Sequence, residues 1–435
     1  VDAYYSTFFP SVQENTWNPK KSPAKRLFIF FYFVYNRRSL IFIKIIGDVR
    51  MEMNTQSQSE KQRNTGYFAF FLSGICAISS GVVVSLLQEL YGFDYGMTGT
   101  LLSLMSIGNL IAGFAAGILP AKIGLKKTVL LLTIGYFAGY LLMGLSSLMA
   151  IFMLAFFIVG VAKGSTINIC TILVRDNSED GTKGMNLMHS CYALGALLCP
   201  FFIGAAAKFN SRAPMFVLAA CGLLLWFSFA SVSLRTRSQQ KEGSVDWSFL
   251  KSWKFWLLTG LLFCQNAAET SVTGWMVTYF KGSNILSGVL STYTVTVMWT
   301  ATLIARMLIA FVFPIKNAPS SMIKMSIGCI IFYIGLMAAH TQISAILLLF
   351  AFAFSMAGLN PTAVASAGRM TSVTSMGVML PAASSGAIVM PWLIGIISEY
   401  GGIKAGMASN IVPCAGLLFF CIALKKLEKN ERSHT

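Results

Sequence analysis

A few ionisable side chains lie inside long apolar stretches of this 435-residue sequence. Glu269 lies slightly beyond the middle of one stretch, and Gln265 precedes it by four residues, which places both on one face of a helix. Lys163 lies near the middle of another stretch. A charge in an apolar environment is costly unless it faces a cavity or a partner. We therefore expect a carboxylate and an ammonium in a polar cavity, or a structural ion pair between two helices; Lys163 could also extend along its helix to reach water.

Other polar side chains in these stretches are further candidates for a site. Arg306 either faces the same cavity or reaches the nearest membrane surface, and His189 is either a hydrogen-bonded helix contact or a proton relay. The asparagines in these stretches either bind a solute or form hydrogen bonds between helices. Trp275 is either an interfacial anchor or a surface that stacks on a sugar ring. The candidates for proton coupling are Glu269 and His189. The candidates for solute binding are Lys163, Asn168, Gln265, Asn266, Trp275, Asn360 and Arg306, with Asn109 as a further amide.

The composition indicates a protein that is mostly embedded in lipid. Hydrophobic residues make up 55% and charged residues 11% of the chain, whereas a soluble domain has about 25% charged residues. The mean hydropathy is +0.68. The net charge is +17. Because the basic residues lie in short loops and the two tails rather than on one face, we expect no nucleic-acid partner.

The sequence carries no sign of metal, redox or hydrolytic chemistry. All nine cysteines lie inside apolar runs, without a CxxC pair or a Cys/His cluster. We therefore expect no disulfide framework, no metal site and no cofactor. The HExxH, GxSxG and Gly-x4-Gly-Lys-Ser/Thr motifs are also missing. We expect no enzyme and no ATP-driven pump, so energy must come from an ion gradient or from the solute's own gradient.

Twelve apolar stretches are long enough to cross a membrane as helices, which predicts an all-α polytopic membrane protein with twelve transmembrane helices. The polar insert 235–253 separates six stretches at 66–234 from six at 254–424, and 425–435 forms a tail. Basic residues gather in alternate loops and in the tail. Because such loops stay cytoplasmic, we expect both termini on that side of the cell membrane. The stretches are 66–90, 97–119, 128–147, 149–173, 184–207, 213–234, 254–280, 286–313, 321–339, 342–361, 374–398 and 402–424.

The segment 1–65 is a basic and polar extension that differs from the rest of the chain. Its apolar run at 27–35 is too short to span a membrane, and it lacks a small-residue cleavage site. The first methionine is Met51. We expect residues 1–50 not to be native sequence; the alternative is a basic, aromatic arm that lies on the membrane surface.

One ten-residue stretch occurs twice in the chain. Residues 195–204 read Gly-Ala-Leu-Leu-Cys-Pro-Phe-Phe-Ile-Gly, and residues 386–395 read Gly-Ala-Ile-Val-Met-Pro-Trp-Leu-Ile-Gly. A repeat of about half the apolar region is typical of secondary transporters. Proline bends a membrane helix, and glycine lets helices approach closely. We therefore expect Pro200 and Pro391 to bend two helices at a moving interface, with Gly195 and Gly386 as close contacts.

The turn at 117–127 resembles the loop signature of the major facilitator superfamily, Gly-x-x-x-Asp-Arg/Lys-x-Gly-Arg-Lys/Arg. The matching residues are Gly117, Lys122, Gly124, Lys126 and Lys127. Ala121 stands where the family usually has Asp, so the resemblance does not extend to the salt bridge that this Asp makes at the family's inner gate. The resemblance implies two six-helix bundles that rock about a central solute site, in a monomer.

Two further stretches resemble the fucose-permease-type sugar:proton symporters. These are 186–200, Asn-Leu-Met-His-Ser-Cys-Tyr-Ala-Leu-Gly-Ala-Leu-Leu-Cys-Pro, and 269–275, Glu-Thr-Ser-Val-Thr-Gly-Trp. The resemblance implies uptake of a small polar solute, a sugar, by alternating access and in symport with protons. The residues leave other hypotheses open. Lys163 and Arg306 suit an organic-anion carrier, the aromatic content suits multidrug-type efflux, and a membrane receptor is disfavoured by the repeat.

Overall fold

A computed structural model of the chain describes residues 58–179, 181–234, 248–370 and 373–434. Within these ranges the regular structure is helical throughout. The expectations for residues 1–50 and for most of the insert 235–253 concern residues outside the described ranges. From that insert the structure describes 248–253, which contain the short helix η2 (Ser248–Lys251) and the first residue of α9.

The first half of the chain supplies six crossings. The first is the helical segment Gln58–Tyr91, which ends in α2 (Ser80–Tyr91). Asp94 caps the next helix, because its carboxylate accepts a hydrogen bond of 2.6 Å from the amide of Met97. The helices that follow α2 are α3 (Tyr95–Ile123), α4 (Leu125–Thr133) with α5 (Gly135–Leu145), α6 (Met149–Asp176), α7 (Gly181–Ala207) and α8 (Ala213–Ala230).

The second half begins with α9 (Trp253–Gly282), the longest helix that carries polar residues of the predicted site. Next, α10 (Gly288–Thr292) and α11 (Thr294–Met307) continue into a π-helical turn, η3 (Leu308–Val312). The remaining helices are α12 (Ala318–Met337), α13 (Gln342–Met356), α14 (Leu359–Met370), α15 (Val373–Ser384), α16 (Gly386–Ala408) and α17 (Ile411–His434).

The helix lengths agree with twelve crossings. Among the described residues, ten segments are long and apolar enough to span a membrane. One of them, Val378–Lys429, has 52 residues, or about 78 Å of helix, which exceeds twice the thickness of a hydrocarbon core of about 30 Å. It is broken at Gly402, where φ is 78°, so it accounts for two crossings. The 30 residues of α9 add another, since they extend about 45 Å.

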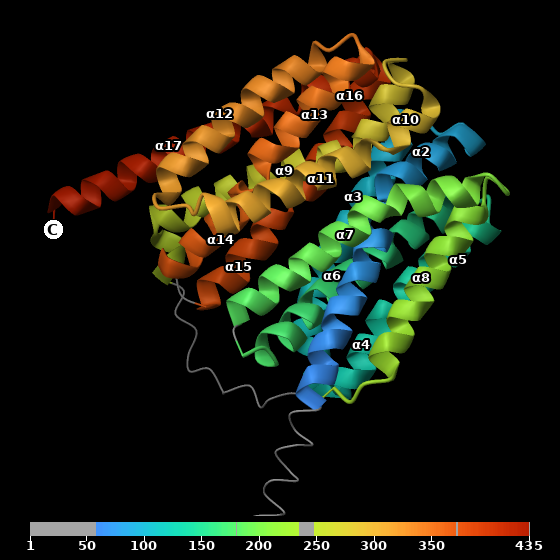
Figure 1. Cartoon of the computed structure of the whole chain (residues 1–435), viewed down its shortest axis with the longest axis horizontal. Coiled ribbons are helices and arrows are strands. Elements are labelled where there is room, and N and C mark those ends of the chain that lie inside the picture. The colour runs from blue at the N-terminus through green and yellow to red at the C-terminus, as the bar shows by residue number, and fades with distance from the viewer. Residues whose placement is uncertain (1–57, 180, 235–247, 371–372, 435) are drawn as a thin grey trace, which may run out of the picture. The chain divides into compact units, whose positions relative to one another are not determined.

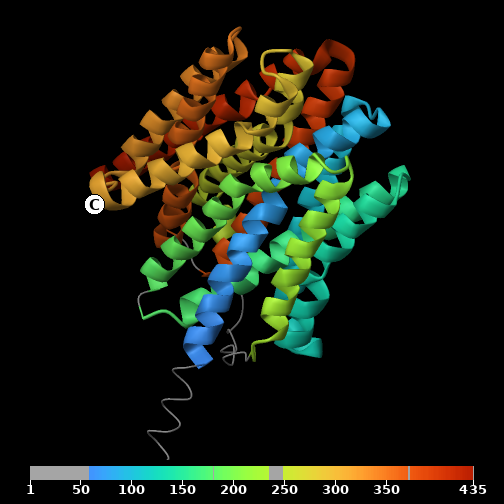
Figure 2. The ribbon, with the colours of Figure 1, turned by 45° about the vertical axis from the view of Figure 1, so that its right-hand side comes forward.

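The two halves of the chain form two groups of helices within the described residues 59–434. Figures 1 and 2 show the helices coloured blue to green gathered on one side and those coloured yellow to red on the other. The sequence repeat has a structural counterpart in each group. A Cβ atom added at Gly195 would lie 2.0 Å from the carbonyl oxygen of Phe71, and one added at Gly386 would lie 2.1 Å from that of Phe263. Thus α7 packs on the first helical segment as α16 packs on α9.

These contacts revise the role expected for Gly195 and Gly386. Each glycine brings two helices of its own half together, so neither touches the other half at this point. One close approach between the halves involves Gly99 of α3, where a Cβ atom would lie 2.9 Å from the carbonyl oxygen of Pro391 and 3.1 Å from the Cα atom of Gly395. The second copy of the repeated stretch therefore contributes its proline and its last glycine to the interface between halves.

Candidate functional site

A cavity of about 290 Å³ lies between the two halves and receives residues from both. From the first half it is lined by the first helical segment, α3, α6 and α7, and from the second half by α9, α11, α14 and the α15–α16 region. Of the residues selected from the sequence, it brings together Asn109, Lys163, His189, Asn266, Glu269, Arg306 and Asn360.

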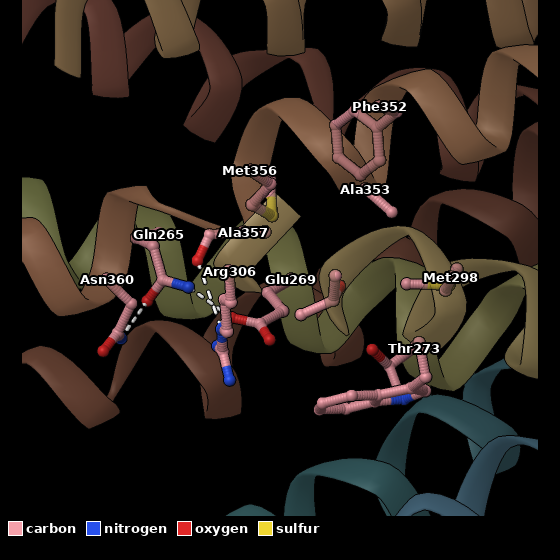
Figure 3. A pocket seen from close by; sticks show the side chains of 12 residues that line it. Gln265, Glu269, Thr273, Met298, Arg306, Phe352, Ala353, Met356, Ala357 and Asn360 are labelled. Carbon is pink, nitrogen blue, oxygen red and sulfur yellow. Dashed lines mark hydrogen bonds between the residues drawn. The ribbon is translucent and has the colours of Figure 1, made fainter. Parts of the chain in front are cut away.

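Glu269 is held by a chain of amides. The Nε2 atom of Gln265, one helical turn earlier on α9, donates a hydrogen bond to Oε2 of Glu269. In turn, Nδ2 of Asn360 on α14 donates a hydrogen bond of 2.6 Å to Oε1 of Gln265, as Figure 3 shows. Among the described residues, Oε1 of Glu269 has no hydrogen-bond partner. The two amide side chains thus fix the orientation of the Glu269 carboxyl group and leave one of its oxygens available.

The two cations of the cavity are not paired with this carboxylate. Within the described ranges, neither Lys163 nor Arg306 comes within 4.0 Å of a carboxylate oxygen. Arg306 donates from Nε to the carbonyl oxygen of Ala357 over 3.4 Å, and it lines the cavity instead of reaching a membrane surface. The ammonium of Lys163 has no hydrogen-bond partner in the described part of the chain. The structure therefore does not contain the alternative, a structural ion pair between Lys163 on α6 and Glu269 on α9.

A second, much smaller hollow adjoins Glu269. Its volume is about 20 Å³, and Gln265, Thr273 and Arg306 are among its lining residues (Figure 3). A space of about 10–15 Å³ holds one water molecule. The hollow therefore has room for a water beside the carboxyl group.

Another part of the cavity wall is formed by aromatic residues that were not among the candidates chosen from the sequence. The rings of Tyr192 and Trp299, which come from different halves, meet edge to face with centroids 5.6 Å apart. The ring of Phe70 lies 4.8 Å from that of Tyr192. Trp299 is buried, and its Nε1 atom has no hydrogen-bond partner among the described residues. An unpaired N–H beside a cavity is suited to an oxygen atom of a solute.

Three of the selected residues do not line the 290 Å³ cavity, and one of them, Gln265, borders the smaller hollow instead. Trp275 is fully buried, and its Nε1 donates a 3.0 Å hydrogen bond to the carbonyl oxygen of Pro391. The ring is enclosed by protein and does not line the cavity, so neither of the two roles expected for Trp275 fits its position. Asn168 lies on α6 next to the lining residue Ile167 but does not itself line the cavity. His189 does line the cavity and contacts the ring of Phe70 edge-on at 5.6 Å.

The basic turn between α3 and α4 contacts the end of α8. Nζ of Lys126 donates hydrogen bonds of 2.7 Å to the carbonyl oxygens of Phe229 and Ala230. They are the last two carbonyls of α8, and a cation at a helix C-terminus is favourable. Gly124 has φ of 84°, a conformation that other residues rarely adopt. Lys122 and Lys127 are exposed. The surroundings of Gly117 and Ala121 lie outside what the structure describes.

The comparison with known families identifies the fold. Residues 66–380 match the family model of the Major Facilitator Superfamily. The chain belongs to this superfamily. It is accordingly an integral membrane transporter and not an enzyme.

Relatives of this superfamily member are similar over most of their length. Protein TsgA of Shigella flexneri is 21% identical over 403 residues, which cover 88% of this chain and 99% of the relative. The TsgA homolog of Buchnera aphidicola subsp. Baizongia pistaciae is 19% identical and covers 82% and 93%.

Solved structures share the same fold. A variant of the nucleoside transporter NupG superposes with a TM-score of 0.70 at 13% identity, covering 85% of this chain and 99% of that one. A bacterial homolog of the human lysosomal transporter Spinster, in an inward-facing and unoccupied conformation, gives a TM-score of 0.69 at 11% identity, with coverage of 86% and 98%.

Proposed function

We propose that this protein is a proton-coupled secondary transporter of a small polar solute, a sugar, and that it works by alternating access across the cell membrane. The observation that carries the proposal is the polar cavity between the halves, in which Glu269 keeps one oxygen available. Several hydrogen-bonding groups surround this carboxyl group, which suits a solute with many hydroxyls. The resemblance of 186–200 and 269–275 to sugar:proton symporters supports the same choice.

The cavity favours a solute of modest size. Its volume of about 290 Å³ lies just below the range of about 300–1,000 Å³ for sites that bind drug-sized ligands. Its lining contains a carboxylate, two cations and several amides. A small volume with so many polar groups argues against multidrug-type efflux of amphipathic compounds.

A second candidate function is organic-anion transport. The observation that favours it is the pair of cations, Lys163 and Arg306, which line the cavity without a carboxylate partner within 4.0 Å in the described part of the chain. A solute carboxylate would form charge-assisted hydrogen bonds with both. In a sugar transporter the same cations donate to hydroxyl or ring oxygens.

Glu269 is proposed as the proton carrier, and His189 is the second candidate. When the cavity is open to water, the carboxyl group releases its proton. When the cavity is occluded and the solute is bound, a neutral carboxyl group avoids an uncompensated charge in an apolar environment. The water-sized hollow beside Glu269 supports proton exchange through a single water molecule.

Uptake into proteoliposomes tests the proposal. The purified protein is reconstituted with a proton gradient, acidic outside, and supplied in turn with labelled monosaccharides and labelled small carboxylates. Accumulation of a sugar that collapses with a protonophore supports sugar:proton symport. Accumulation of a carboxylate instead supports the second candidate, and accumulation of neither under any gradient contradicts the proposal.

The orientation and the oligomeric state are also part of the proposal. The C-terminal part of α17 and the α3–α4 turn carry many of the basic residues, which supports cytoplasmic termini by the positive-inside rule. Each chain contains both halves and a complete cavity, which supports a functional monomer.

A further inference from the structure

A second large cavity lies wholly within the second half of the chain. It has a volume of about 800 Å³ and is formed by the end of the α11–η3 helix, the start of α12, the middle of α14 and the last turns of α17. Three of its lining residues are lysines, Lys316, Lys425 and Lys429, against one carboxylate, Glu428. The cavity wall is therefore positively charged, and the central cavity shares none of these residues.

A buried hydroxyl group at this cavity lacks a partner. Ser366 is 3% exposed, lines the cavity, and its Oγ atom has no hydrogen-bond partner among the described residues. Buried hydroxyls are normally hydrogen-bonded, so an unpaired one beside a cavity is evidence for a ligand atom there. By contrast, the neighbouring Thr362 donates to the carbonyl oxygen of Gly358 at 2.6 Å.

The start of α12 adds to the positive potential. Asn317 accepts a hydrogen bond of 3.1 Å from the amide of Ser320, so one donor of the first turn is satisfied. The helix dipole still favours a negative charge at this end. The cavity thus combines cationic side chains, a helix N-terminus and a free hydroxyl, which together suit a phosphate group.

The surroundings of the cavity are apolar on one side. Ile309, Ile315 and Pro361 belong to its wall. Next to them on the helix end, Phe311 is 81% exposed and Phe313 is 69% exposed. In a membrane protein, large apolar side chains on the outside of a helix face lipid chains. A ligand here would have an anionic head in the cavity and acyl chains along these phenylalanines.

We propose that this cavity binds the phosphate headgroup of an anionic phospholipid. Lys316, Lys425 and Lys429 surround the phosphate, Ser366 donates a hydrogen bond to one of its oxygens, and the acyl chains lie against Phe311 and Phe313. Basic pockets between membrane helices, close to the surface, are suited to such headgroups. Since α17 supplies two of the lysines, the bound lipid fixes the last helix against α12 and α14.

Lipid binding to the full-length protein in detergent tests the proposal. Phosphatidylglycerol or phosphatidylcholine is added at equal molar ratios, and bound lipids are counted by native mass spectrometry while the unfolding temperature is measured. We expect one retained phosphatidylglycerol and a higher unfolding temperature, and neither effect with phosphatidylcholine. Replacing one lysine by glutamine should weaken binding about fivefold, and the triple variant K316Q/K425Q/K429Q should abolish retention.

Two variants separate this site from a general charge effect. Lys426 is exposed on α17 beside Lys425 but does not line the cavity, so Lys426→Gln should retain the lipid. Ser366→Ala removes the unpaired hydroxyl with little change in packing and should weaken binding several-fold. The proposal is overturned if Lys426→Gln weakens binding as much as Lys425→Gln, or if Ser366→Ala leaves binding unchanged. Equal stabilisation by millimolar inorganic phosphate without lipid would overturn the lipid as the source of the phosphate.

Discussion

Glu399 on α16 accepts hydrogen bonds from the first backbone amides of α3, at 3.1 Å from Tyr95 and 3.4 Å from Gly96. A carboxylate of the second half thus caps a helix of the first half, where the helix dipole favours a negative charge. Nearby, Lys281 forms an ion pair of 2.7 Å with Glu89, which again joins the two halves. Both interactions lie where the first helical segment ends and α3 begins, so they close that end of the cavity.

Breaking this closure should shift the protein toward the conformation that is open at that end. Because Glu399 is exposed, we expect Glu399→Gln to remove about 0.3–1 kcal/mol, which changes the ratio of the two conformations by up to about fivefold. The charge reversal Lys281→Glu should have a similar effect, and the double reversal with Glu89→Lys should restore the original ratio.

Distances between spin labels at Leu148 and Val289 measure this ratio, since both positions are exposed, at 67% and 71%. Leu148 directly precedes α6 in the first half, and Val289 lies in α10 of the second half. Glu60→Gln serves as a control, because Glu60 is an exposed carboxylate at the other end of the first segment. A distance distribution that does not change in Glu399→Gln and Lys281→Glu would show that these contacts do not hold the halves together.

Replacing the proposed proton carrier should separate coupling from binding. Glu269→Gln keeps the shape of the side chain and imitates the protonated form, so we expect loss of uphill, proton-driven uptake with exchange of solute between equal compartments at least partly retained. Both rates are measured in the same proteoliposomes, with Glu60→Gln as the control. If the variant still accumulates solute when a proton gradient is the sole driving force, Glu269 is not the coupling site, and His189→Gln becomes the next variant to test.

The unpaired N–H group of Trp299 predicts that an oxygen atom of the solute contributes to binding in the cavity. Trp299→Phe keeps the edge-to-face contact with Tyr192 but removes the Nε1 donor. If this N–H binds a solute oxygen, we expect KM to rise about fivefold to tenfold, as for a hydrogen bond worth about 1 kcal/mol. Trp275→Phe is the matched variant, and it should affect stability rather than KM because the Trp275 N–H binds Pro391. Equal KM values in the wild type and Trp299→Phe would contradict this role.

The two glycines of the repeat should be sensitive to a single methyl group. A Cβ atom at Gly195 or Gly386 would overlap a backbone oxygen of the neighbouring helix, so we expect either alanine variant to lose about 1–3 kcal/mol of stability. Folded yield in detergent and the unfolding temperature measure this loss. Gly204→Ala is the control from the same stretch, because its Cβ atom would meet the hydroxyl of Tyr293 at an ordinary 3.5 Å. Wild-type stability of Gly195→Ala and Gly386→Ala would exclude these close contacts.

Cysteine labelling in intact cells tests the orientation. With cytoplasmic termini, single cysteines introduced at 208–212 or 281–284 should react with a reagent that does not cross the membrane, while those at 176–182 and 236–250 should not. The native cysteines are mostly buried, and the parent protein shows how much they react. Labelling of 236–250 from outside would reverse the proposed topology.

Much of the fold could be predicted from hydropathy, because a helix that crosses a membrane needs a long apolar run. The site could be predicted in part for the same reason. Glu269, Lys163 and Arg306 stand out because charges are rare in such runs. Tyr192 and Trp299 could not be selected, since an aromatic residue in an apolar run is compatible with any packing position. The difference between Trp275 and Trp299 depends on which carbonyl oxygen lies beside each ring, and local sequence does not contain that information.

The hollow beside Glu269 bears on which ion can be the coupled one. A metal cation that leaves water needs several oxygen ligands around it to replace its hydration shell. The hollow holds about 20 Å³ and is bordered by the guanidinium of Arg306, so a sodium ion would have little room there for a full set of ligands and a positive charge close by. A proton needs only a lone pair on Oε1 of Glu269. The dimensions and charge of this small space therefore favour protons over sodium as the driving ion.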